Sequence, residues 1–211
     1  MAFRVAFSQA PSCYPSRMQP SFRNWATMDQ EYAPRDWTAG EVFLNAEGGP
    51  TGNSWADRED TDPFVLGGRR SFAMGGDGPV RQVAVYDRER SRYLFPGGRT
   101  GIRGRGKLGR FGPNHAADPI VTRFHKGRLQ VVLIRRNDGS DELAFPGGMV
   151  DPGATHTTTL KSEFTQEAVK PGGAVDTLFS ECSRGIVYRG VVDDWRTTDE
   201  AWIETHALNF Q

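Results

Sequence analysis

The stretch that decides the fold is residues 144–169, AFPGGMVDPGATHTTTLKSEFTQEAV. It begins with the end of an apolar strand, turns through Pro-Gly-Gly and crosses a loop before a helix-like run begins. On that helix Glu163, Gln166 and Glu167 occupy positions i, i+3 and i+4, so their side chains share one face. The spacing therefore predicts a helix with a carboxylate-bearing face.

An apolar stripe adjoins this face of the predicted helix. It consists of Leu160, Phe164 and Ala168, and it would anchor the helix to a sheet. The carboxylates would then point at whatever lies over the glycine turn at 146–148. A strand, a glycine turn and a helix with carboxylates one turn apart can form a small divalent-metal site, because Mg²⁺ takes oxygen ligands.

The C-terminal half of the chain reads as strands around this helix, which predicts an α+β domain. The helix is expected over 157–169, with a threonine as its N-cap and a Lys-Pro-Gly-Gly stop at 170–173. A short helical turn is expected near 175–179. Strands are expected at 120–124, 128–136, 143–145, 185–192 and 202–210, with a hairpin-type turn at 137–140.

The N-terminal half carries little regular pattern. We expect a loop-rich accessory subdomain over 1–97, with one strand at 82–86. Residues 98–113 form a basic, glycine-rich connector, which packs across the following domain and supplies arginines to an anionic ligand. The α+β domain then occupies 114–211.

Composition places few demands on the partners of this chain. Its 211 residues allow one large domain or two small ones, and its net charge of zero requires neither nucleic acid nor an acidic membrane. Charge is nevertheless uneven: residues 29–62 hold nine acidic and two basic residues, and 69–110 hold eleven basic and three acidic. This asymmetry leaves three readings open: contact between the two segments, an anion site in the basic one, or two solvated faces.

The cysteines and the N-terminus bear on the compartment. Cys13 and Cys182 are distant and form no disulfide framework, so an intracellular, reducing compartment is expected. The first 28 residues contain three arginines and no acid, a composition that also occurs in organellar transit peptides. Cytoplasmic and mitochondrial locations both stay open, and no apolar run approaches the ~20 residues of a membrane helix.

The spacing of the opening stretch resembles the box of the Nudix hydrolase family. Five residues separate Gly148 from position 154, and seven more separate that position from 162–167. Residues 98–124, 144–153 and 188–205 also resemble the mitochondrial-type ADP-ribose pyrophosphatases and the ADP-ribose-sensing domain of melastatin-type TRP channels. The resemblance implies a Nudix-type α/β/α sandwich with a mixed sheet. The family's closing C-terminal helix has no counterpart before Gln211, which would leave an apolar face of the sheet open.

The resemblance also implies roles for individual residues. Glu163 and Glu167 match the catalytic and metal-binding glutamates, with Mg²⁺ as cofactor and Mn²⁺ possible. Gln166 replaces a third glutamate and would assist weakly. Gly147 and Gly148 would bring the helix beside the diphosphate of the substrate.

Further residues are expected to contact the nucleotide. Asp194 suits ribose hydroxyls and Arg196 suits phosphate, although an Asp–Arg ion pair at a turn is the alternative. His115 and Asp118 would line the side of the terminal ribose, and the alternative for His115 is a turn histidine. Phe145 would stack on adenine, or else belong to the core.

One last-strand glutamate leaves two interpretations. Glu204 would add a metal or water ligand, but an exposed strand glutamate is favoured over that role.

Three departures from the family pattern decide between two functions. Ala154 replaces the first box glutamate, Ser162 replaces the box arginine, and Gln166 removes a charge. The leading hypothesis is a Mg²⁺-dependent enzyme that hydrolyses ADP-ribose to AMP and ribose 5-phosphate with slowed turnover. The alternative is a module that binds ADP-ribose without useful turnover, and a third, RNA binding by the connector at 98–113, is not expected.

Overall fold

The computed structural model describes residues 25, 32–61, 71, 85–136, 142–151, 153–169, 173–181 and 184–211. It divides into two compact units. Among the described residues, unit 1 comprises His115–Gly190 and Thr205–Gln211, and unit 2 comprises those up to Asn114 together with Val191–Glu204. The boundaries expected at 97 and 113 stay a prediction. Both cysteines, the turn at 137–140 and most of the strand expected at 82–86 lie outside the described residues, as do positions 170–172 of the helix stop.

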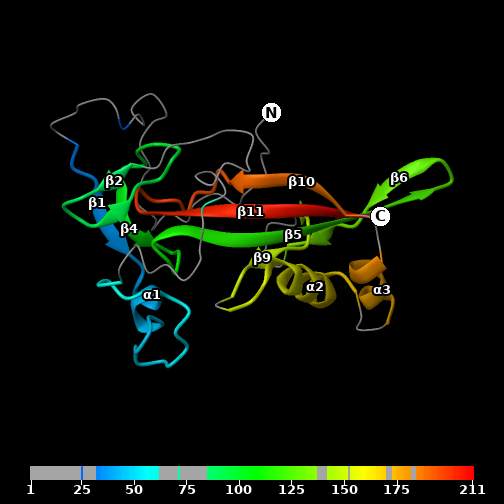
Figure 1. Ribbon diagram of the computed structural model, residues 1–211, viewed down its shortest axis with the longest axis horizontal. Coiled ribbons are helices and arrows are strands. Elements are labelled where there is room, and N and C mark those ends of the chain that lie inside the picture. The colour runs from blue at the N-terminus through cyan, green and yellow to red at the C-terminus, as the bar shows by residue number, and fades with distance from the viewer. Residues whose placement is uncertain are drawn as a thin grey trace. The chain divides into compact units, whose positions relative to one another are not determined.

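A five-stranded sheet runs in the order β10-β11-β5-β6, with β9 paired to β5 outside that path (Figure 1). Its strands are β5 Gly112–His125, β6 Arg128–Val131, β9 Gly148–Met149, β10 Arg184–Val191 and β11 Ala201–Phe210. Strand β5 begins eight residues before the predicted start at Ile120, and it therefore absorbs the end of the predicted connector. The α+β class is confirmed.

The strand predicted over 128–136 is broken into two. Strand β6 pairs with β5, and the Val132 amide still donates to the Val121 carbonyl at 2.9 Å. The chain then changes partner, because β7 Ile134–Arg135 pairs with β8 Leu143–Ala144. An apolar run cannot reveal such an exchange of partners, since both halves have the same strand-like composition.

Helix α2 spans His156–Glu167 and starts as the sequence predicts, behind a threonine cap. The Thr155 hydroxyl accepts the Thr158 amide at 3.1 Å, and the Thr158 hydroxyl accepts the Thr155 amide at 3.0 Å. This reciprocal capping box satisfies backbone donors that the first turn would otherwise leave open. Helix α3, Gly173–Glu181, extends the short helical turn expected near 175–179 to nine residues.

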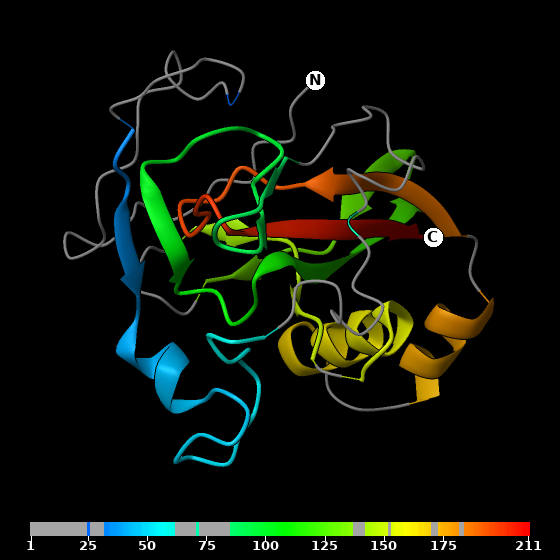
Figure 2. The same cartoon turned by 60° about the vertical axis from the view of Figure 1, so that its left-hand side comes forward.

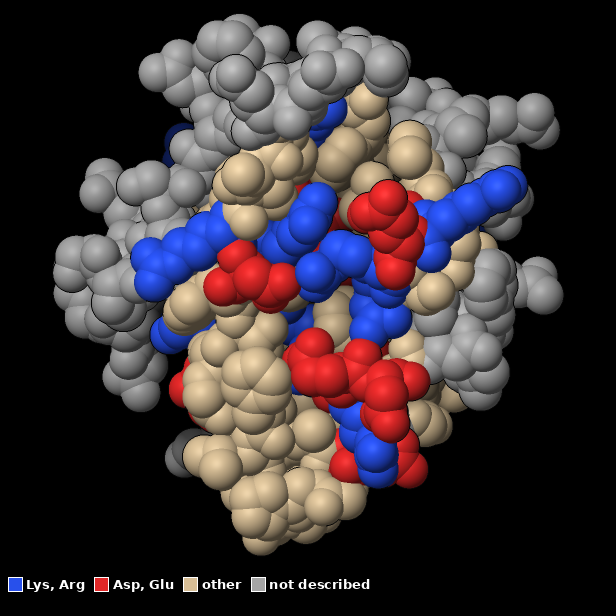
Figure 3. Space-filling view, turned by 90° about the vertical axis from the view of Figure 1, so that its left-hand side faces the viewer, with Lys and Arg blue, Asp and Glu red and all other residues tan. Residues whose placement is uncertain are grey.

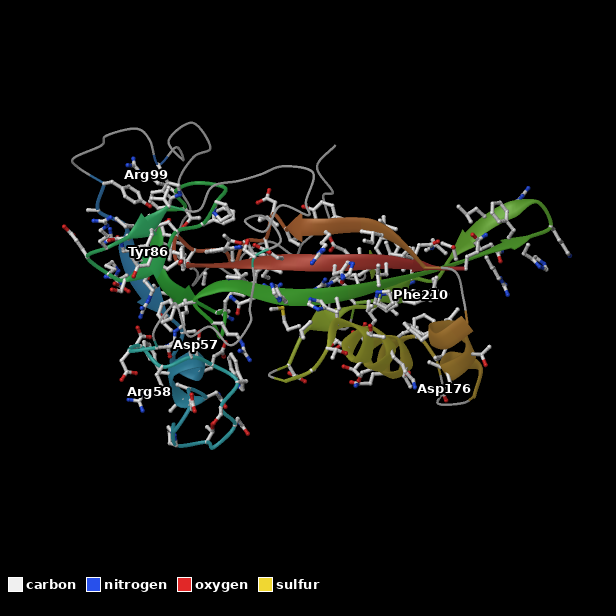
Figure 4. The ribbon with its side chains drawn as sticks, viewed as in Figure 1. Asp57, Arg58, Tyr86, Arg99, Asp176 and Phe210 are labelled. Atoms are coloured by element: carbon white, nitrogen blue, oxygen red, sulfur yellow. The ribbon has the colours of Figure 1, made fainter. Side chains whose placement is uncertain are left out.

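The core of unit 1 lies between these helices and the sheet. Leu160 and Phe164 of α2 are buried in one cluster with Ala117 of β5 and Phe210 of β11. Figures 1 and 2 both show α2 and α3 on the same side of β5. Phe179 of α3 joins the cluster, with its ring centroid 4.5 Å from that of Phe210, which is labelled in Figure 4. The predicted apolar stripe therefore does anchor the helix to the sheet.

Unit 2 has little regular structure in its described residues, as expected for the N-terminal half. Strand β1 Arg35–Thr38 pairs in parallel with β4 Ile102–Gly106, and α1 Gly40–Leu44 follows β1. A short hairpin joins β2 Tyr86–Asp87 to β3 Arg92–Tyr93.

The acidic and basic segments of unit 2 contact each other. Arg90 pairs with Asp36 at 3.0 Å and also with the buried Glu200. Arg105 is fully buried, pairs with Glu59 and donates to the main-chain carbonyl of Asp57, a residue labelled in Figure 4. Charges of both signs lie side by side in the view onto β1 and β4 (Figure 3). Contact between the segments, one of the three open readings, is therefore confirmed.

Candidate active site

The carboxylate of Glu163 packs directly on Gly148, so the glycine turn and the helix meet as the sequence predicts. A Cβ atom built on Gly148 would lie 2.5 Å from the Glu163 carboxyl carbon. Two structural supports produce this approach: β9 is held against β5 by the Ala117–Gly148 pair, and α2 is anchored through its apolar stripe. Glycine is needed here for space alone, because its backbone does not have a positive φ.

The other glycine of the turn, Gly147, lies against two further carboxylates, those of Glu167 and Asp118. The Gly147 amide donates to Glu167 Oε2 at 3.0 Å. A Cβ on Gly147 would come within 2.0 Å of Asp118 Oδ1. The other oxygen of Asp118 accepts the hydroxyl of Thr205 on β11. The turn is thus lined by Asp118 of β5 and by Glu163 and Glu167, which lie one helical turn apart on α2.

Mutual repulsion and burial shape the protonation of these carboxylates. Burial raises the pKa of Glu163, and the neighbouring charges of Glu167, Asp151 and Asp118 raise it further. Burial likewise raises the pKa of Asp118, with a smaller contribution from Glu167, while the Thr205 hydrogen bond opposes the shift. Four acidic groups in one place without an opposing cation are electrostatically unfavourable, so the region favours a bound cation.

The donor set fits a divalent cation that keeps other oxygen ligands. Within the described residues, no three His, Cys, Asp or Glu side chains are arranged to coordinate one ion directly. Glu163 and Glu167 could supply one or two carboxylate ligands, and substrate phosphates and water would supply the rest. This is the usual way in which Mg²⁺ is held.

The two substitutions in the box form one neutral pair. Gln166 Nε2 donates to Ser162 Oγ at 2.7 Å, across one turn of α2. Both side chains are exposed. One amide hydrogen of Gln166 is therefore used within this pair.

A cluster of three histidine rings lies at the start of α2, and no sequence pattern predicted it. The ring centroid of His156 lies 5.3 Å from that of His115 on β5 and 5.7 Å from that of His206 on β11. Burial lowers the pKa of His156 and of His206, and the positive charge of Arg189 on β10 lowers both further. These residues come from four elements far apart in sequence, so no spacing could have linked them.

His115 and Phe145, predicted at the substrate, lie in unit 1. His115 is half-buried within β5 rather than in a turn, and its ring contacts His156. Phe145 is half-buried immediately before the glycine turn. Their contacts with a ligand stay predictions.

Asp194 and Arg196, the remaining predicted nucleotide contacts, lie in unit 2. Three hydrogen bonds join them: Arg196 donates to the Asp194 carboxylate from its main-chain amide at 2.8 Å, from Nε at 2.9 Å and from Nη2 at 2.7 Å. The aspartate is fully buried, whereas a third of the arginine side chain is exposed. Asp194 therefore orients the guanidinium of Arg196, whatever that group recognises.

Glu204 corrects an expectation, because it is fully buried rather than an exposed strand glutamate. Its Oε1 accepts the hydroxyl of Ser71 and, at 2.8 Å, the indole N–H of Trp202. Both faces of β11 are buried over Ala201–Thr205, so strand alternation leaves no exposed position there.

Comparison with known proteins agrees with this geometry. No family model matches the chain. A Caenorhabditis elegans protein named putative nudix hydrolase 6 is 46% identical, over 83% of this chain and 68% of its own length. The chain belongs to the Nudix hydrolase family.

Two other relatives of this Nudix chain carry more specific names. A rat protein named mitochondrial ADP-ribose pyrophosphatase is 37% identical, over 88% of this chain and 57% of its own length. A Nematostella vectensis protein named TRPM member-like 2 is 36% identical, over 92% of this chain and 13% of its own. The chain therefore spans little more than half of the rat relative. None of the helices that the structure describes has the length and apolar composition needed to cross a bilayer.

Gly148→Ala tests the contact between the turn and the helix. The added methyl must displace the Glu163 carboxylate, which is the flexible end of a side chain and can move at little cost to stability. We expect Mg²⁺ or Mn²⁺ affinity, measured by calorimetry, to fall about 10–100-fold, as when positioning groups are lost from metal sites. The unfolding temperature should stay near that of the wild type.

Gly185→Ala is the matched control, because a Cβ there meets nothing within 4 Å. Equal cation affinity in the two variants would contradict the role of the Gly148 contact.

The lowered pKa values of His156 and His206 in the histidine cluster predict that the folded protein loses stability in acid. A lowered histidine pKa in the folded state means that the unfolded chain binds more protons below about pH 6.5, the ordinary histidine value, so stability falls as the pH drops through that value. We expect the acid-induced loss in unfolding temperature to be smaller in His156→Gln than in the wild type. The raised carboxylate pKa values act in the opposite direction but are shared by both proteins.

His125→Gln serves as the control, because His125 is exposed on β5 and lies outside the histidine cluster. The interpretation fails if His125→Gln and His156→Gln change the pH dependence equally.

Proposed function

We propose that this chain hydrolyses ADP-ribose to AMP and ribose 5-phosphate with the help of Mg²⁺ or Mn²⁺. The observation that supports this most is the seating of Glu163 on Gly148, with Glu167 holding the Gly147 amide. The name of the rat relative supports ADP-ribose as the substrate. The rat name also supports a mitochondrial location within the intracellular compartments that the sequence allows.

Glu163 and Glu167 would hold the cation. When bound, the cation neutralises phosphate charge and favours the ionisation of an attacking water. A water oxygen attacks phosphorus, the bridging P–O bond breaks, and the departing phosphate oxygen carries away the electron pair. Glu163, whose pKa burial raises toward neutrality, accepts the proton that the water releases.

Asp118 acts by positioning in this proposal. It is anchored by Thr205 and lies against Gly147, so it holds the turn at the height that the helix carboxylates require. A substrate phosphate placed over this turn would meet the exposed ends of Glu163 and Glu167 rather than Asp118.

Nucleotide recognition is assigned to side chains already described. Arg196, oriented by Asp194, would bind phosphate, and a third of its side chain is exposed. Phe145 would stack on adenine, and His115 would face the terminal ribose.

The neutral pair Ser162–Gln166 supports slowed turnover. Loss of one preorganised electrostatic group commonly reduces rate by ~10²–10³. The same observation favours a second function, a module that binds ADP-ribose and releases it unchanged. The TRPM-like relative is consistent with such a module.

The decisive experiment is an AMP-release assay with pure protein, ADP-ribose and Mg²⁺. We expect AMP to form at a rate that Glu163→Gln abolishes, because the variant lacks the proton acceptor and one ligand charge. If the wild-type protein releases no more AMP than Glu163→Gln does, the proposal that the chain is an enzyme is wrong. Calorimetric binding with intact ADP-ribose recovered afterwards would then identify the sensor.

Restoring the box charges tests the slowed turnover. We expect Ser162→Arg with Gln166→Glu to raise kcat by about 10²-fold, since both electrostatic groups return. Gln166→Glu alone should give less, because Ser162 would still bind its side chain.

Thr157→Arg is the control, because it adds a positive charge to an exposed position of α2 that lies in the spacer of the box and is not one of its patterned residues. An unchanged kcat in the double variant would mean that these positions do not limit turnover.

A further inference from the structure

The end of the β5–β6 hairpin, residues 122–131, exposes large apolar side chains. Phe124 is 67% exposed, Leu129 61% and Val131 43%. The Asn209 side chain of β11 reaches only as far as Ile120 and Thr122. Beyond Thr122, β5 pairs with β6 alone among the described strands, and Figure 1 shows this hairpin extending past the end of β11. Clustered apolar exposure on a defined element commonly marks an interaction site.

The hairpin has two chemically distinct faces. Phe124 lies opposite Leu129 in the register, and Thr122 lies opposite Val131, so these four residues share one face. On the opposite face Arg123 lies opposite Gln130 and His125 lies opposite Arg128. One face is therefore mainly apolar and the other is basic.

Its charge is of one sign only. Residues 122–131 contain three Lys or Arg and no Asp or Glu. The turn itself, Lys126–Gly127, has positive φ at both positions, 50° and 72°, as in the tight turns preferred by two-residue hairpins. The two faces are therefore held in a fixed relation by a short turn.

Strand β6 is also an edge. The sheet path ends at β6 in the described part of the chain, so one side of its backbone has no strand partner there. Basic residues on an edge strand can discourage pairing between copies of a protein. That purpose accounts for the basic face but gives no reason for the exposed Phe124–Leu129 pair.

We propose that the β6 edge accepts an extended segment of a partner protein in which apolar and acidic residues alternate. An added strand has two faces of its own, so its apolar side chains would meet Leu129 and Val131 while its carboxylates meet Arg128 and Arg123. Backbone hydrogen bonds to β6 would supply affinity, and the two faces would supply specificity.

Other occupants match this surface less well. A second copy of the hairpin would bring Arg128 and Arg123 against the same basic face, which is repulsive. A flat lipid surface can meet the apolar face or the basic face, but not both together. An alternating acidic strand is complementary to both.

The test uses a labelled peptide of about eight alternating Val and Glu residues, which is a common strand length. We expect fluorescence anisotropy to detect binding that Arg128→Glu and Leu129→Ser each weaken about tenfold. Peptide binding should also slow amide hydrogen exchange at 128–131. A peptide of the same composition, with four Glu followed by four Val, should not bind, because its residues do not alternate between faces.

Arg88→Glu is the matched control, because Arg88 is exposed in the turn between β2 and β3. This variant should bind the peptide as tightly as the wild type does. All variants are compared only after their unfolding temperatures are shown to be unchanged. Equal binding of the two peptides, or exchange at 128–131 that the peptide does not slow, overturns the proposal. So does binding to phosphatidylserine vesicles, or self-association, that Leu129→Ser abolishes while the alternating peptide does not bind.

Discussion

The close approach of the Glu163 carboxylate to Gly148 is the constraint on which the candidate site depends. It requires two elements to be placed accurately: β9 through its pairing with β5, and α2 through Leu160 and Phe164 in the core. Any side chain larger than hydrogen at position 148 would occupy the carboxylate's place. The packing of an apolar stripe thus sets the geometry of a charged group that lies on the next face of the same helix.

This arrangement concentrates negative charge, because the neighbouring charges that shift the pKa of Glu163 all come from acidic residues. Glu163 and Asp118 both respond with raised pKa values, chiefly because they are buried. Ser162 and Gln166 contribute no opposing charge, because they bind each other as a neutral pair. A bound cation would relieve this repulsion, so the positions of the carboxylates favour cation binding.

In unit 2, by contrast, acidic and basic side chains pair with each other. Its acidic segment and its basic segment pair internally, so that even the fully buried Arg105 finds Glu59 and main-chain carbonyls. The prediction that the connector supplies arginines to a ligand does not hold for Arg105, whose two terminal nitrogens bind Glu59 and main-chain carbonyls within unit 2. Removing Glu59 would leave the buried guanidinium of Arg105 without its carboxylate partner, so this part of the glycine-rich segment has a structural role.

Local spacing in the sequence was enough to determine several features. The capped helix, its apolar stripe, the carboxylate face and the glycine turn are all encoded within 144–169, because helical periodicity and turn chemistry depend on neighbouring residues. Tertiary structure alone decided that 128–136 divides between two partners, that both faces of β11 are buried around Glu204, and that the rings of His115, His156 and His206 come together. Those outcomes depend on which distant segments meet, and strand pairing and burial are set by contacts that no local pattern of residue types records.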